Sequence, residues 1–184
     1  MFTRKTLVGL AGLTALCVAS SGTASTDRPD SNDERAWLAE HNAARAQFGS
    51  APVRWNSDLE NEARQWASRL ARSGQFQHSD YRNRNGTGEN LWMGTRGYYK
   101  ASQMIASFVD ERRHFVPGRF PQVSRTGNWA DVGHYTQIVW PETREVGCAK
   151  ASGRQSDVLV CRYWPSGNVM GEAVAPSRKL ARRR

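Results

Sequence analysis

The sequence contains no apolar run long enough to cross a lipid bilayer. Its most apolar stretch, residues 7–19, is shorter than the ~20 residues that a transmembrane helix needs. Arg4 and Lys5 precede this stretch and small residues at 22–24 follow it, which is the pattern of a signal peptide. We therefore expect export, to the periplasm or the extracellular medium, with cleavage after Ala24. A retained membrane anchor is the alternative, and the short length disfavours it.

Cysteine is also scarce, with 3 residues in the whole chain. Cys17 would leave with the signal peptide, so the mature protein would keep Cys148 and Cys161. An even pair in an exported domain is typical of a disulfide, because oxidising compartments preserve such bonds. A cysteine zinc site is disfavoured, since the two residues lack the usual paired spacing. No serine or cysteine is seen beside a base that could activate it as a nucleophile.

The basic excess is concentrated at one end of the chain. There are 26 Lys and Arg residues against 17 Asp and Glu, a net charge of +9. Removing the leader and the basic segment 178–184 leaves a body of net charge about +2. A nearly neutral body argues against specific nucleic-acid binding by the domain. We expect residues 175–184 to be a disordered tail, and binding to anionic surfaces to depend on residues 178–184.

The rest of the chain shows neither an internal repeat nor a second domain boundary. Residues 25–32 form a short polar linker, and residues 33–174 are long enough for one domain with a sizeable core. Its oligomeric state is not apparent from the sequence.

Three helices are expected from apolar residues at helical spacing. They cover residues 33–48, 57–73 and about 101–112. Asp33 is expected to cap the first helix, and Ser57 with Glu60 to form a capping box on the second. On the third, Glu111 shares the inward face with Phe108, which is an unusual place for an acid.

Strands follow the helices along the chain. Residues 145–149 and 158–163 are expected to form an antiparallel hairpin, which brings Cys148 and Cys161 onto neighbouring strands. Residues 134–140 are compatible with either a strand or a helix. Helices first and strands later favour the α+β class.

Four ionisable residues stand out as candidates for a shared site: His78, Glu89, Glu111 and His134. A carboxylate beside a histidine fixes the tautomer of the ring, and two such pairs facing each other could bind a divalent cation. The alternative is that they are structural hydrogen-bonding groups, which is commoner for isolated His and Glu. His41 lies on an apolar helix face and is expected to bond a core partner.

Two longer motifs resemble the hallmarks of a known family. Residues 133–140 (GHYTQIVW) and 159–169 (LVCRYWPSGNV) are similar to the signature motifs of the CAP superfamily, which includes cysteine-rich secretory, antigen 5 and pathogenesis-related proteins. Shorter matches occur in the family's order at residues 40–45, 76–79, 88–92 and 108–111. Together the motifs span nearly the whole body.

The resemblance implies a three-layer α-β-α sandwich with a central antiparallel sheet. It also implies a cleft tetrad of His78, Glu89, Glu111 and His134, in which the two histidines hold a divalent metal, often zinc. Lipid, either sterol or fatty acid, is the leading ligand class in the family. One departure is that Phe108 stands where the family usually has tryptophan.

Three functions follow from these expectations. The first is a binding module that recognises a metal or a lipid, and the second is a metal-dependent hydrolase that uses a glutamate as base. The third makes the tetrad a structural polar network. Two histidines fall short of the three protein ligands of a catalytic zinc site, so we favour binding.

Overall fold

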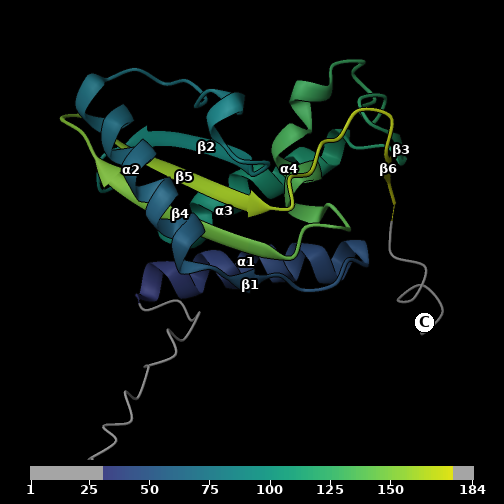
Figure 1. Cartoon of the computed structure of the whole chain (residues 1–184), viewed down its shortest axis with the longest axis horizontal. Helices are drawn as coiled ribbons and strands as arrows, with labels where there is room; N and C mark the ends of the chain where they lie inside the picture. Colours follow the sequence, from purple (N-terminus) through teal and green to yellow (C-terminus); the bar gives the residue numbers. More distant parts are fainter. Residues whose placement is uncertain (1–30, 176–184) are drawn as a thin grey trace, which may run out of the picture.

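Helices cover both faces of a four-stranded sheet in the computed structural model, which describes residues 31–175 (Figure 1). The strand order is β1-β4-β5-β2, and these strands are Arg54–Trp55, Glu145–Ser152, Ser156–Trp164 and Gly88–Thr95. Short β1 pairs with β4 in parallel, and the other pairs are antiparallel. The predicted α+β sandwich is therefore confirmed, with one parallel pair in the sheet. The predicted signal peptide and nearly all of the tail lie outside the described residues.

The sheet separates two cores. Helix α2 (Ser57–Ser73) packs on one face, and α1 (Asn32–Phe48), α3 (Ala101–Val109) and α4 (Gly133–Val139) lie on the other (Figure 1). Because successive strand residues point to opposite faces, Val158 and Val160 of β5 enter the core under α2. Leu159 and Cys161 enter the larger core on the other side. None of the helices within residues 31–175 combines the length and apolarity that a membrane crossing requires.

Helix α1 begins slightly earlier than the sequence predicted. Ser31, rather than Asp33, caps it: the Ser31 hydroxyl accepts from the amide of Glu34, and the Glu34 carboxylate accepts from the amide of Ser31. The helix ends at Gly49, as expected, in the left-handed conformation with φ 95°. Serine and aspartate are nearly equal as caps, so residue type alone could not choose between them.

Helix α2 is capped differently from the prediction. The side chain of Asn56 accepts hydrogen bonds from the amides of Asp58 and Leu59, at 2.9 and 3.0 Å. The capping box predicted from Ser57 and Glu60 is wrong, because the Glu60 carboxylate instead accepts from the indole of Trp55.

The third predicted helix is divided in two. The α-helix α3 ends at Val109, and the chain continues as a 3₁₀ helix, η2 (Asp110–His114), which carries Glu111. The ambiguous segment 134–140 is mostly helical and forms α4. The remaining elements are η1 (Tyr81–Asn83), η3 (Trp129–Asp131) and a small second sheet of β3 (Gly118–Arg119) and β6 (Ala173–Val174).

The predicted hairpin of β4 and β5 is confirmed, and both strands extend beyond the predicted limits. Cys148 lies directly opposite Cys161 in the register, and the two form a disulfide that is almost fully buried. The sequence did not predict β2 as a strand, although residues 88–92 were recognised as a motif. Its polar residues Glu89 and Asn90 are buried and therefore hide the apolar alternation of a strand.

A buried arginine fastens α1 to the end of α4. Arg45 is fully buried, and its guanidinium donates to the carbonyls of Ala51, Ile138, Trp140 and Thr143. Burial lowers the pKa of Arg45 to about 10, so the side chain stays charged at neutral pH. It satisfies carbonyls that the end of α4 leaves without helical partners.

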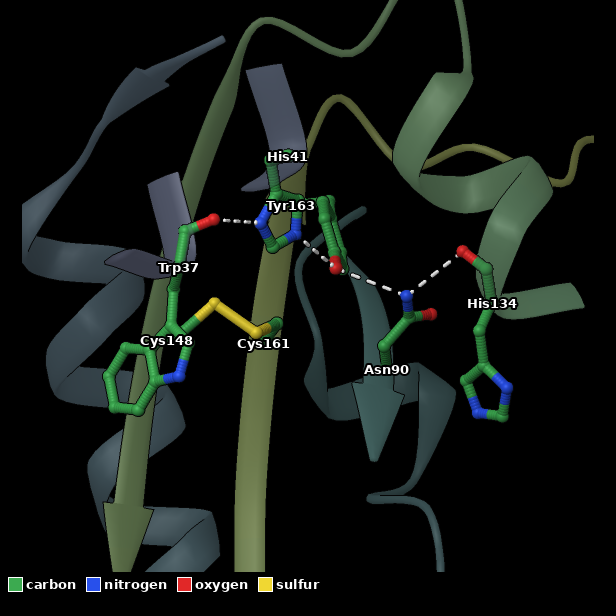
Figure 2. Close-up of a disulfide and its surroundings, with 7 residues drawn as sticks. All are labelled: Trp37, His41, Asn90, His134, Cys148, Cys161 and Tyr163. Atoms are coloured by element: carbon green, nitrogen blue, oxygen red, sulfur yellow. Dashed lines mark hydrogen bonds between the residues drawn. A yellow bond between two sulfur atoms is a disulfide. The ribbon is translucent and has the colours of Figure 1, made fainter. Parts of the chain in front are cut away.

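A chain of buried hydrogen bonds connects α1 with α4 through side chains of β5 and β2 (Figure 2). The Asn90 amide nitrogen, which can only donate, bonds the hydroxyl of Tyr163 and the carbonyl of His134, both at 3.1 Å. The hydroxyl in turn donates to Nε2 of His41 at 2.8 Å, and Nδ1 of His41 donates to the carbonyl of Trp37 at 2.7 Å. His41 therefore bonds core partners, as predicted, and its neutral tautomer is fixed.

His41 is expected to make the fold sensitive to mild acid. Burial, the largest effect, lowers the pKa of His41 to about 4, against an ordinary value of 6.5. As the pH falls from 6.5 to about 4, the unfolded chain takes up a proton that the folded chain does not, so stability is lost over this range. The loss should approach about 3 kcal/mol. Urea denaturation at pH 7 and pH 4.5 should show a smaller loss for H41Q than for the unsubstituted protein.

The matched control is H114Q, which changes a partly exposed histidine. Its acid sensitivity should equal that of the unsubstituted protein. Equal acid sensitivity in H41Q and the unsubstituted protein would show that His41 is not the responsible group.

Candidate functional site

A cavity of about 480 Å³ lies where the start of β2 meets the start of α4, within the usual size range of small-molecule sites. Three of the four predicted site residues line it: His78 from the segment after α2, Glu89 from β2 and His134 from α4. Glu111 does not line the cavity itself, but its carboxylate bonds the ring of His134, which does.

The first pair of the tetrad is built around a fully buried carboxylate. Oε1 of Glu89 accepts from Nδ1 of His78 at 2.7 Å and from the amide of Ser79 at 3.0 Å. Oε2 accepts from the hydroxyl of Ser79 at 2.8 Å and lies 3.1 Å from the guanidinium of Arg162. Burial alone would raise the pKa of Glu89, but the His78 bond, the Arg162 charge and the Ser79 bonds outweigh it and lower the pKa. Glu89 is therefore ionised at neutral pH, and Nδ1 of His78 carries a proton.

The second pair is built at the beginning of α4. Oε1 of Glu111 lies 2.6 Å from Nδ1 of His134, and Oε2 accepts from the amides of His134 and Tyr135 at 3.0 and 3.1 Å. The ring of Phe108 stacks on the imidazole of His134, with 4.5 Å between centroids and 19° between planes. The carboxylate and the stacked ring together fix the orientation of His134.

The two pairs differ in electrostatics. Glu89 is compensated by Arg162, whose pKa is lowered by burial despite the opposing effect of the Glu89 charge. Glu111 accepts instead from backbone amides and His134. The first half of the cleft therefore contains a buried ion pair with an arginine, whereas the carboxylate of the second half is held by two backbone amides and the His134 ring.

Glycine brings three segments of the motifs into close contact beside the cavity. A side chain at Gly88 would collide with Gln137 of α4. The amide of Gly167 donates to the side-chain oxygen Oε1 of Gln137 at 3.0 Å, and a Cβ at Gly167 would lie 2.8 Å from the Trp140 side chain. The glycines thus allow β2, α4 and the segment after β5 to meet at one glutamine.

The sequence interpretation missed most of the cavity wall and the partners of Glu89. Exposed aromatic and apolar side chains form part of the rim, and several amide, hydroxyl and guanidinium groups lie between them. The wall residues that were not anticipated are Tyr81, Arg84, Asn90, Phe120, Trp129, Ala130, Gln137, Ser166, Asn168 and Met170. Arg162 could have been noticed as the one charged residue in the apolar run 158–163, since a buried charge needs a partner.

A second cluster of metal-ligand types occurs near His41. One ring nitrogen of His41 and the sulfur atoms of Cys148 and Cys161 all lie within 4.8 Å of one another. Metal binding by cysteine needs thiolates, whereas these sulfurs are joined in the disulfide. This cluster is therefore part of the core.

The layered fold and a cleft with two carboxylate-bound histidines define the class of protein, an α-β-α sandwich of the CAP type. Residues 38–163 match the model of the Cysteine-rich secretory protein family, CAP, and the chain belongs to this family.

Relatives in plants support this assignment. The chain is 32% identical over 165 residues to "Pathogenesis-related protein PRMS" of Zea mays, covering 88% of this chain and 94% of that protein. It is 33% identical over 144 residues to "Pathogenesis-related protein 1B" of Nicotiana tabacum, covering 77% and 80%.

Solved structures share the fold. NaASP2, in a crystal structure with Zn²⁺, superposes with a TM-score of 0.69 at 24% identity, covering 82% of this chain and 90% of that chain. BmVAL-1 gives a TM-score of 0.66 at 21% identity, covering 85% of each chain.

Removing the cation beside Glu89 is expected to destabilise the fold strongly. R162M leaves a buried carboxylate without its compensating charge, which should cost about 3 kcal/mol in the free energy of unfolding. The matched control is R54M, because Arg54 pairs with Glu145 but its side chain is 72% exposed, so its loss should cost less than about 1 kcal/mol. Denaturant unfolding at pH 7 measures both.

A third variant distinguishes the effect of the unpaired charge on stability from the effect of lost packing. R162M/E89Q removes both members of the pair and should be more stable than R162M alone. Equal stability of R162M and R54M would contradict the role assigned to the buried pair.

Proposed function

We propose that the protein is an exported CAP-domain binding protein whose cleft holds a divalent metal, zinc in the first place, through His78 and His134. The observation that carries the proposal is that each imidazole is bonded at Nδ1 by a carboxylate, at 2.7 and 2.6 Å. Histidine ligands of metals usually donate their second nitrogen in this way, which orients the ring and strengthens the ligand.

The two imidazole nitrogens that His78 and His134 offer are ligand atoms that suit zinc. Within residues 31–175, Nε2 of neither histidine has a hydrogen-bond partner, so both atoms are available as ligands. Both rings line the same cavity. Two imidazoles leave coordination positions for water or for a bound molecule. The zinc in the NaASP2 structure supports the same metal here.

The cavity rim suits a ligand with an apolar part. Tyr81, Trp129 and Met170 are 64%, 43% and 66% exposed at its edge, while Arg84, Asn90 and Gln137 supply polar groups. Apolar walls with a few polar groups are typical of small-molecule sites. We propose lipid, either sterol or fatty acid, as the ligand class for this cleft.

Binding is favoured over hydrolysis by the state of the carboxylates. A hydrolase would need one of them as a base for water. The lowered pKa of Glu89 makes it a weak base, and four donors already surround it. Glu111 likewise accepts three hydrogen bonds. Export is proposed from the predicted signal peptide and from the secretory family that the chain belongs to.

Zinc titration tests the metal proposal directly. Replacing His78 or His134 with alanine removes one of two protein ligands and should weaken zinc binding by well over 100-fold. E111Q should weaken it less, by roughly 10- to 100-fold, because it affects the metal only through His134. Isothermal titration calorimetry at neutral pH provides the affinities, with circular dichroism to establish that each variant is folded.

H114A is the matched control, since His114 does not line the cleft, and its zinc affinity should be unchanged. Zinc binding of H78A/H134A at the affinity of the unsubstituted protein would refute the metal site and favour a structural network.

A further inference from the structure

A cluster of two exposed tyrosines and a partly buried tryptophan lies at the far end of β2 from the cleft. The ring centroids of Trp92 and Tyr99 are 5.1 Å apart, and those of Tyr98 and Tyr99 are 5.0 Å apart. Tyr98 is 74% exposed, Tyr99 38% and the adjacent Met93 47%. We call Trp92, Met93, Tyr98 and Tyr99 the β2-end platform. Figure 1 places this end of β2 beside the turn between β4 and β5, away from α4, β3 and β6.

The platform is held in place by the backbone around it. Gly94 has no side chain, which lets the Trp92 ring lie over it, and a Cβ there would also be 2.8 Å from the Tyr99 ring. Gly97 adopts a left-handed turn with φ 71°, and its amide donates to the carboxylate of Asp157 at 2.8 Å. The amide of Arg96 donates to the carbonyl of Gln155 at 3.0 Å. The exposed rings are therefore presented by an ordered loop.

The platform occupies the free edge of the sheet. Strand β2 is the last in the order β1-β4-β5-β2, and its second half is the exposed half. Trp92 and Met93 point to opposite faces of the sheet, as successive strand residues do. A surface that approaches this edge would therefore meet both side chains, together with the tyrosines of the following loop.

Exposed cations lie in the loop after β2 and in the turn between β4 and β5, and the acid in these segments is buried. Arg96, Lys100 and Arg154 are exposed, and the guanidinium of Arg96 donates to Gly153 in the same turn as Arg154. Residues 92–100 and 151–157 are all described and contain one acid, Asp157. Asp157 is 2% exposed and bonded to Gly97 and Ser152. The near-neutral net charge of the body conceals this local excess of positive charge.

We propose that the β2-end platform is a contact surface for an anionic phospholipid bilayer. Tyrosine suits the membrane interface because its ring is apolar and its hydroxyl is polar. Three exposed cations attract the anionic headgroups, and Met93 adds a flexible apolar side chain. Stacking of successive sugars needs ring faces that lie side by side, whereas these rings meet edge to face, at 81° and 76°. A bilayer therefore fits better than a polysaccharide.

Vesicle co-sedimentation of the full mature chain tests this surface. Vesicles of phosphatidylcholine with phosphatidylglycerol should bind the protein, and pure phosphatidylcholine should bind it much less. Y98S/Y99S and R96Q/K100Q should each weaken binding at least tenfold, the first by removing interfacial rings and the second by removing charge. The matched control F76S/R125Q changes an exposed ring and an exposed cation outside the platform, and should bind like the unsubstituted protein.

The same assay on a chain lacking residues 178–184 distinguishes vesicle binding by the basic tail from vesicle binding by the platform. The charge count alone assigned binding of anionic surfaces to residues 178–184; the platform proposal differs and expects this chain still to bind anionic vesicles, with Y98S/Y99S weakening its binding by the same factor. Unchanged vesicle binding of both platform variants in the full chain would overturn the proposal. Polygalacturonate serves as the polysaccharide probe, and platform variants that lose binding to it while keeping vesicle binding would also overturn the proposal. Zinc affinity should be the same in the platform variants, so the outcome does not depend on the cleft.

Discussion

The cleft depends on one buried charge, the carboxylate of Glu89. A carboxylate without access to water must be compensated by donors, because desolvation otherwise disfavours the ionised form. Here the donors come from two places in the chain: His78 and Ser79 after α2, and Arg162 on β5. Satisfying Glu89 therefore attaches the irregular segment after α2 to the sheet, and the same bonds place His78 on the cavity wall.

The half of the cleft around His134 is positioned by a different set of contacts. Glu111 joins η2 to the beginning of α4, and Phe108 stacks on the histidine that α4 carries. Arg45 fixes the other end of α4 to α1, and Asn90 of β2 donates to the carbonyl of His134. Because Asn90 directly follows Glu89 on β2, one strand contacts both halves of the cleft. Strand β2 therefore links the contacts that place the two histidines.

The sequence predicted those features that depend on local patterns. Periodic apolar residues identified three helices, and the two apolar runs at the C-terminal side identified the hairpin that pairs Cys148 with Cys161. The caps were misplaced because Ser, Asp and Asn serve almost equally well at neighbouring positions. Strand β2 was missed because Glu89 and Asn90 face buried polar partners. The seven residues of α4 are too few for a helical period to be distinguished from a strand.

The site itself was beyond reasoning from residue chemistry alone. His78 and His134 are far apart in the sequence, and isolated histidines and glutamates are usually structural. Residue chemistry singled out the four residues as candidates, the resemblance to the family implied that they form one tetrad, and the structure brought each histidine to its carboxylate. The compensating role of Arg162 and the cavity wall depend on long-range packing. The charge count of the body likewise could not reveal that exposed cations gather at one end of the sheet.

Strand β2 separates the cleft from the β2-end platform: its first half is buried at the cleft and its second half is exposed at the platform. Residues in a strand rise by about 3.3 Å each, so Glu89 and Met93 lie roughly 13 Å apart along β2. A surface that binds the exposed half would therefore leave the entrance of the cleft, at the other end of the strand, open to a ligand.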